Sequence, residues 1–166
     1  MTTAPPRPAA QLSSPVVRQA NALDAAALHA LSRQFFRCGA LRERPAGHYA
    51  AEAADFLVAE LPGDAPAGCL GLRTHPDEPH GPAAVLYNFC VSPGSQGRGV
   101  GSALLRSALA QAAARSLRAV FTATTGSGEL FLRHGFTPIA LELAPLTWVN
   151  ALDPRRGSTV LARTLN

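Results

Sequence analysis

Short apolar stretches separated by turn-forming residues run along most of the chain, and this pattern predicts a domain in which strands predominate. The stretches combine valine, leucine, alanine and phenylalanine, and glycine, proline or charged residues bound them. Predicted strands cover residues 16–20, 56–60, 68–74, 83–91, 119–123, 137–143 and 160–164. A proline- and glycine-rich turn at 61–66 indicates that the second and third strands form a hairpin.

Apolar residues at helical spacing predict helices between some of these strands. Asn21 is a typical N-cap, and apolar residues follow it at intervals close to those of one helix face, namely Leu23, Leu28, Leu31 and Phe35. Further helices are expected from Pro45, over 101–117 and over 128–134. Residues 144–158 form a long connection between the last two predicted strands.

These elements together predict one mixed α/β (α+β) domain over residues 15–166, preceded by a loose tail at 1–14. A chain of 166 residues is long enough to bury one hydrophobic core. No apolar run is long enough to cross a bilayer, and the tail has no apolar stretch of signal-peptide type. We therefore expect a cytoplasmic protein with no membrane partner.

The basic residues are all arginines, and the complete absence of lysine excludes two classes of site. A Walker A phosphate loop requires its lysine, and Schiff-base chemistry, including that of pyridoxal phosphate, requires a lysine amine. The net charge is +4, but the arginines are scattered and no aromatic residues alternate with them. Nucleic acid is therefore not an expected partner.

The cysteines and histidines do not form a recognisable metal-binding pattern. Cys38, Cys69 and Cys90 are far apart and contain no Cys-x-x-Cys pair, so we expect buried or semi-buried free thiols rather than a disulfide or zinc. Prolines interrupt the histidines and acids of residues 75–80, and this segment is interpreted as a solvated loop. No metal is expected.

Residues 91–105 contain the most informative feature, a glycine-rich turn between a predicted strand and a predicted helix. Glycines allow backbone N–H groups to converge without side chains in the way, and the helix N-terminus adds partial positive charge. This combination is typical of a pyrophosphate site. The spacing of Gly97, Gly99 and Gly101 differs from the Gly-x-Gly-x-x-Gly of dinucleotide-binding folds. A connection without any ligand is the remaining alternative.

Gln96-x-x-Gly99-x-Gly101 resembles the coenzyme A motif of the GNAT superfamily of N-acetyltransferases. Its surroundings are also similar, because residues 87–91 followed by Ser92-Pro93 look like the family's fourth strand and residues 130–136 like its late helix. The resemblance covers nearly the whole chain apart from the N-terminal tail. It implies a GNAT fold with a central mixed, mostly antiparallel sheet of about seven strands and about four flanking helices.

The resemblance also implies acetyl-CoA as co-substrate and assigns residues to it. Backbone N–H groups of the loop would hold the pyrophosphate, and the amides of pantetheine would pair with the fourth strand. The residues assigned to acetyl-CoA in this way are Phe89, Cys90, Val91, Gln96, Gly97, Arg98, Gly99, Val100, Gly101, Ser102 and Phe131.

Catalysis in this family usually proceeds by direct attack of a neutral amine on the thioester in a ternary complex, so a base or a water must take up a proton. Tyr87 and Asn88 are candidates to position a water, and Glu60 is a candidate base. Phe131 stands where the family often has a tyrosine that protonates the thiolate, and His134 is a conceivable substitute.

The acceptor implied by the resemblance is the primary amine of a small molecule. Phe131 and scattered similarities point to the amino-acid N-acetyltransferases, whose substrate carboxylate would require an arginine. The candidates for that role are Arg37, Arg42, Arg44 and Arg73. Two alternatives remain open: acetylation of a protein or peptide, and a non-catalytic module that binds acyl-CoA. Homodimers are common in the family, so a homodimer is a further expectation.

Overall fold

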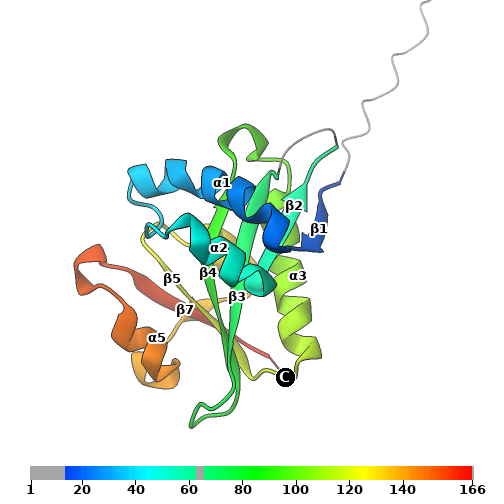
Figure 1. Cartoon of the computed structure of the whole chain (residues 1–166). Helices are drawn as coiled ribbons and strands as arrows, with labels where there is room; N and C mark the ends of the chain where they lie inside the picture. The colour runs from blue at the N-terminus through cyan, green and yellow to red at the C-terminus, as the bar shows by residue number, and fades with distance from the viewer. Residues whose placement is uncertain (1–13, 63–65, 166) are drawn as a thin grey trace, which may run out of the picture.

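The computed structural model describes residues 14–62 and 66–165, and these form a seven-stranded mixed sheet with helices on both faces (Figure 1). The strands are β1 Val16–Gln19, β2 Phe56–Glu60, β3 Gly68–His75, β4 Ala83–Val91, β5 Ala119–Thr124, β6 Thr137–Pro138 and β7 Thr159–Thr164. They follow the order β1-β2-β3-β4-β5-β7-β6. All neighbouring pairs are antiparallel except β4 and β5, which are parallel. The predicted mixed, mostly antiparallel sheet is confirmed.

The described residues contain five α-helices, where about four were expected. They are α1 Ala25–Arg37, α2 Ala46–Ala51, α3 Val100–Ala114, α4 Glu129–Arg133 and α5 Leu146–Ala151. The additional helix, α5, lies within the connection 144–158, where Pro145 precedes its first turn. Its six residues are too few to show a helical period clearly, which is why the sequence did not reveal it.

The predicted strand at 137–143 is wrong beyond its first two residues. Thr137 and Pro138 pair with Ala162 and Leu161, and the chain then turns into a 3₁₀ helix at Leu141–Leu143. Proline has no N–H to donate to the ladder, and Leu141 and Leu143 are exposed, so no buried face supports a longer strand. The predicted tail at 1–14 lies almost entirely outside the described residues.

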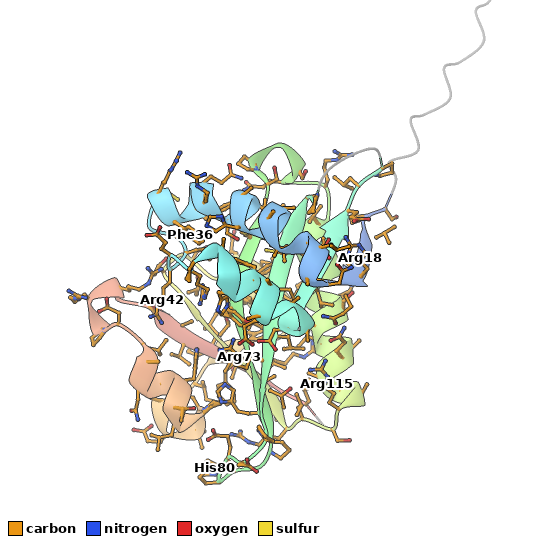
Figure 2. All side chains as sticks on the ribbon, in the orientation of Figure 1. Arg18, Phe36, Arg42, Arg73, His80 and Arg115 are labelled. Carbon is orange, nitrogen blue, oxygen red and sulfur yellow. The ribbon has the colours of Figure 1, made fainter. Side chains whose placement is uncertain are left out.

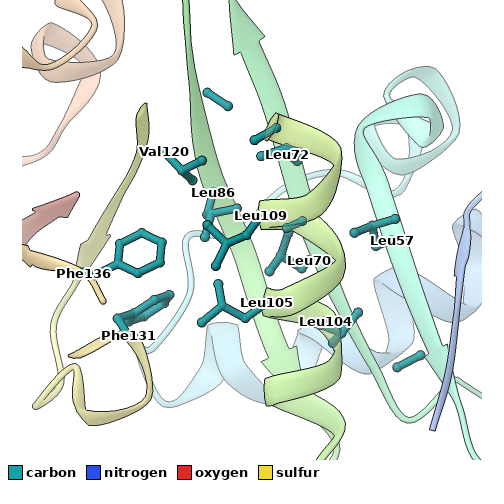
Figure 3. Close-up of a cluster of buried hydrophobic side chains, with 14 of the residues drawn as sticks. Leu57, Leu70, Leu72, Leu86, Leu104, Leu105, Leu109, Val120, Phe131 and Phe136 are labelled. Carbon is teal, nitrogen blue, oxygen red and sulfur yellow. The ribbon is translucent and has the colours of Figure 1, made fainter. Parts of the chain in front are cut away.

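The main hydrophobic core lies between α3 and one face of the sheet (Figure 3). Leu104, Leu105 and Leu109 of α3 pack against leucines of β2, β3 and β4. Phe131 and Phe136 extend this cluster toward α4, with ring centroids 5.4 Å apart. Burial of these side chains fixes α3, and therefore the loop that precedes it, against the end of β4.

The opposite face carries α1 and α2 over β2–β4, and α5 over β5 and β7. Leu28 and Leu31 of α1 and Tyr49 of α2 pack on Phe56 and Val58 of β2. A separate cluster places Trp148 and Val149 of α5 against Phe121 and Val160. A gap therefore remains on this face between the two helical groups. Among the described residues, no helix is long and apolar enough to cross a membrane.

Candidate active site

The parallel strands β4 and β5 diverge after a short stretch of pairing, and the divergence opens the site. The register contains two pairs, Ala84 with Val120 and Val85 with Phe121. Beyond them, the edge of β4 that faces β5 has no strand partner among the described residues. A cavity of about 1030 Å³ occupies this gap and extends over the face between α1 and α5.

A bulge in β4 controls which side chains face which side of this gap. The pairing with β3 shifts between Cys69 and Gly71, so that Asn88 and Phe89 together oppose Leu70. Asn88 has a φ of 49°, in the left-handed region that asparagine tolerates better than most residues. The extra residue places Tyr87 and Asn88 both on the α1 face and turns Phe89 toward α3 and α4.

The glycine-rich loop forms one end of the cavity. Gly97 and Gly99 have φ values of 76° and 81°, which a side chain would strain, and Gly99 caps α3. The lining residues from this loop and the first turn of α3 are Ser95, Gln96, Gly97, Gly99, Val100, Gly101 and Ser102. A Cβ on Gly101 would lie 3.0 Å from Leu130 Cδ2, so a side chain here would force Leu130 of α4 to shift.

Arg98 and Phe131, both assigned to the cofactor by resemblance, lie differently relative to the cavity. Arg98 is exposed and does not line the cavity, so it lies on the outer side of the loop. Phe131 lines the cavity, is 9% exposed, and packs edge-on against Phe89 at 5.7 Å between ring centroids. Its ring has no proton to donate, so it serves as an apolar wall.

The opposite end of the cavity is basic. Five arginines line the cavity, four of them at this end, and the only carboxylate among the described lining residues is that of Asp153, which Arg155 already binds through two side-chain nitrogens at 3.1 Å. Arg42, Arg44, Arg73 and Arg156 lie at this end, whereas Arg133 lines the cavity from α4, the helix beside the glycine loop. Figure 2 shows Arg42 in the loop after α1 and Arg73 on β3 below α2. This charge favours an acceptor or product with an anionic group.

Arg73 and Tyr87 form a neutralised group on one wall of the cavity. Tyr87 donates to Asp55 Oδ2 at 2.7 Å, and Arg73 donates to the same oxygen at 3.1 Å and to the Tyr87 hydroxyl at 3.2 Å. Glu52 lies 3.6 Å from Arg73. Burial, reinforced by the hydrogen bond to Asp55, raises the pKa of Tyr87 well above its ordinary value. Tyr87 is therefore a protonated phenol at neutral pH.

Arg44 stands on the same wall without such neutralisation. Its Nη1 donates to Asn88 Oδ1 at 3.3 Å and to the Arg42 carbonyl at 3.4 Å, and its guanidinium lies 5.0 Å from the centre of the Tyr87 ring. Across residues 14–62 and 66–165, no carboxylate oxygen lies within 4.0 Å of it. Burial lowers the pKa of Arg44, but a guanidinium titrates so high that it remains charged.

Three residues considered from the sequence lie away from this cavity. Glu60 does not line the cavity, and its carboxylate forms an ion pair with Arg18 at 2.8 Å. Arg37 lines a separate, smaller depression beside α1. His134 lies behind the loop, with Nε2 3.2 Å from Ser102 Oγ, and burial lowers its pKa. None of the three is placed to touch a molecule bound in the cavity.

The cysteines are free thiols, as expected, although Cys38 is exposed rather than buried. Cys69 and Cys90 face each other across β3 and β4 with Sγ atoms 3.7 Å apart. The hydrogen bond with the Cys90 thiol, together with burial, raises the pKa of Cys69. Cys90 belongs to the cavity lining. Within the described segments, no group of three or more histidine, cysteine or acidic side chains could hold a metal ion.

Residues 25–136 match the sequence profile of the Acetyltransferase (GNAT) family. The chain belongs to this family. An amino-acid acetyltransferase from Ralstonia nicotianae is 34% identical to it over 98 residues, which are 59% of this chain and 21% of that protein. The GNAT domain described here thus spans about a fifth of the length of that relative.

Solved structures agree with the assignment of this GNAT domain. N-acetylglutamate synthase from Neisseria gonorrhoeae, complexed with coenzyme A and N-acetyl-glutamate, superposes with a TM-score of 0.82 at 27% identity, over 93% of this chain and 36% of the synthase. A Mycobacterium tuberculosis protein in complex with CoA superposes with a TM-score of 0.75 at 24% identity, over 91% of this chain and 99% of that one, and supports the fold alone.

Some lining residues of the GNAT domain were not predicted from the sequence. Arg133 and Arg156 line the cavity, yet they come from α4 and a 3₁₀ turn. For Trp148 of α5 the sequence left open whether it lines a pocket or packs. Trp148 packs on Phe121 at 6.4 Å between ring centroids, so it both packs and lines the site. The available signal was the excess of arginine, which indicates an anionic ligand without telling which arginines meet it.

Proposed function

We propose that this GNAT domain transfers the acetyl group of acetyl-CoA to the amine of an α-amino acid, by direct attack in a ternary complex. One observation carries the proposal: a single cavity joins the glycine loop before α3 to the arginine wall that contains Arg44, a cation without a carboxylate neighbour in the described structure. The Ralstonia relative, named an amino-acid acetyltransferase, and the Neisseria synthase bound to CoA and N-acetyl-glutamate support it.

The loop end of the cavity fits coenzyme A. Residues 96–102 would hold the pyrophosphate with backbone N–H groups, assisted by the N-terminus of the 15-residue helix α3. The edge of β4 at Phe89, Cys90 and Val91 faces the gap without a β5 partner and would pair with the amides of pantetheine. A backbone N–H of this edge would also polarise the thioester carbonyl.

Acetyl-CoA supplies an activated thioester, so that a C–N bond to the acceptor amine forms while the C–S bond breaks. The amine must arrive neutral and lose one proton, and the thiolate must gain one. Tyr87 is a poor base, because its proton is held by Asp55, and Phe131 cannot act as an acid. We assign both proton transfers to water in the cavity rather than to these side chains.

The arginine end of the cavity would bind the carboxylate of the acceptor. We assign this role to Arg44, because it is half-buried on the wall beside β4 and has no neighbouring carboxylate, so it would gain from a bidentate pair with a new one. Arg73 is already engaged by Asp55, and Arg42 is exposed at the rim. Binding the carboxylate at Arg44 would fix the amine relative to the thioester at the β4 edge.

The test is to incubate the purified chain with acetyl-CoA and separate acceptors: α-amino acids including glutamate, their α-amides, polyamines and short peptides. Thiol release and the mass of the product identify the acceptor. We expect turnover on an α-amino acid. We also expect Arg44→Ala to raise the KM for that acceptor at least about tenfold, since a charge-assisted pair contributes roughly 1.5–3 kcal/mol.

Arg33→Ala is the matched control, because Arg33 is an exposed arginine of α1 outside the cavity. Turnover on peptides but on no free amino acid would replace the proposal by peptide acetylation.

Phe131, at the position of the usual acid, favours a second candidate, a binding module. Tight CoA binding with no thiol release from any acceptor would support that candidate and contradict the proposal.

A further inference from the structure

Asn88 lies at the centre of the site wall, buried and in an uncommon backbone conformation. It is 3% exposed, and the bulge that holds it at a φ of 49° directs its side chain away from the β5 gap and toward α1 and α2. The sequence suggested that Asn88 positions a water. In the structure, both ends of the Asn88 amide form hydrogen bonds with other side chains. Another explanation is therefore required for a polar group at this position.

The orientation of the Asn88 amide follows from the protons available around it. Ser32 Oγ donates its only proton to the Leu28 carbonyl at 2.8 Å, so it can only accept from Asn88 Nδ2, 2.9 Å away. The oxygen Oδ1 must then face the other way. It accepts from the Tyr49 hydroxyl at 3.1 Å and from Arg44 Nη1 at 3.3 Å.

Two arginines on this wall therefore have opposite surroundings. Arg73 is bound by the carboxylate of Asp55 at 3.1 Å and lies 3.6 Å from Glu52. Arg44 is held by an amide oxygen, a backbone carbonyl and an aromatic face, all of them uncharged. A carboxylate at residue 88 would have nearly the same shape as the amide but would cancel the charge of Arg44.

We propose that Asn88 is a specificity-positioning residue, whose amide oxygen, oriented by Ser32 and Tyr49, holds the Arg44 guanidinium at the cavity wall while leaving its charge for the acceptor carboxylate. This inference rests on the proposed function, because it requires an acceptor with a carboxylate. Asn88 acts through Arg44 and need not touch the acceptor itself.

The test compares wild type, Asn88→Asp and Ser32→Ala on two acceptors, the preferred α-amino acid and its α-amide. Asn88→Asp keeps the shape and tolerates the left-handed backbone. It should raise the KM for the amino acid about tenfold or more. The kcat, the KM for acetyl-CoA and the KM for the amide should each change less than about threefold. Ser32→Ala removes the acceptor that orients the Asn88 amide, so the amide can rotate. This variant should raise the KM for the amino acid about threefold.

Gln34→Glu is the control, because it makes the same chemical change on the exposed side of α1 and should leave both acceptors unaffected. Equal losses on both acceptors in Asn88→Asp, or unchanged discrimination in folded Asn88→Asp and Ser32→Ala, would overturn the inference while the proposed function stands. If Asn88→Asp does not fold, Ser32→Ala decides. A wild-type protein that does not prefer the α-amino acid over its α-amide would overturn both proposals.

Discussion

Gly71 shows how one missing side chain shapes the wall of the cavity that carries Arg44, Arg73 and Tyr87. The ring of Tyr87 lies across this residue of β3, and a Cβ added there would come within 2.6 Å of Tyr87 Cε1 and 2.7 Å of Cζ. Because the ring can lie flat on β3, its hydroxyl reaches Asp55 and its face lies near Arg44. The position of one ring is thus coupled to the charge arrangement of the whole wall.

Gly71→Ala should therefore damage both stability and acceptor binding. Displacing the half-buried ring costs about 1–3 kcal/mol, as for other overpacked sites, and should raise the KM for the acceptor more than that for acetyl-CoA. Thermal unfolding and steady-state kinetics measure the two effects. Gly47→Ala in α2 is the control, since nothing lies within 4 Å of a Cβ there and the exchange should stabilise the helix slightly. Similar behaviour of the two variants would refute the argument.

At the scale of elements, Arg18 connects β1 to the start of α1 and to the end of β2. Its guanidinium, labelled in Figure 2, binds Asp24 at the start of α1 through two nitrogens. The distances are 2.8 and 2.9 Å, and a third contact reaches Glu60 at the end of β2. Asp24 also accepts from the Asn21 backbone N–H at 2.8 Å and completes a capping box. The hydrogen bonds from Arg18 lower the pKa of Asp24 in the folded protein.

The lowered pKa of Asp24 predicts a pH dependence of stability. A depressed carboxyl pKa contributes stability above its unfolded value of about 3.9, and the contribution is lost as the pH falls through that value toward the folded pKa. Asp24→Asn should lose about 1–2 kcal/mol at pH 7 and show a flatter decline in the free energy of unfolding below pH 4–5. Denaturant unfolding across this pH range measures it, and parallel curves for the two proteins would count against it.

The elements differ in how far the sequence could predict them. The glycine loop and α3 were predicted because their signals are local: a strand, positive-φ glycines and an alanine- and leucine-rich helix follow one another directly. The strand at 137–143 was overextended, because the apolar residues after Pro138 support a 3₁₀ turn instead. The bulge at Asn88 has no sequence signature, and it alone decides that Tyr87 and Asn88 share a face.

At the scale of the whole molecule, the arginine end of the cavity is assembled from segments that are distant in sequence. Arg42 donates to the Ala151 carbonyl at 3.4 Å, and Arg156 donates to the carbonyls of Gly39 and Ala40 at 3.2 and 3.3 Å. These contacts join the loop after α1 to the segment around α5 at the cavity mouth. Periodicity and spacing carry no information about such pairings, so four candidate arginines could not be ranked before the fold was known.

Binding of coenzyme A in this cavity should raise the thermal stability of the whole domain. A ligand that binds only the folded state stabilises it by RT ln(1 + [L]/Kd), about 2.7 kcal/mol at a hundredfold excess over Kd. For a chain of 166 residues this corresponds to a rise in Tm of about 5–10 °C. The rise should depend on the loop, because β4, α3 and α4 meet at Gly101, where a Cβ would lie 3.0 Å from Leu130 and 3.7 Å from Phe89.

Gly101→Val should therefore reduce the CoA-induced rise in Tm to about 1 °C or less, because its side chain would occupy space that lines the cavity. The Tm without ligand separates this loss from simple unfolding. Gly94→Ala is the control in the same connection, since it does not line the cavity and nothing lies within 4 Å of a Cβ there, and it should keep the full shift. A full shift in folded Gly101→Val would mean that coenzyme A binds elsewhere than the gap between β4 and β5.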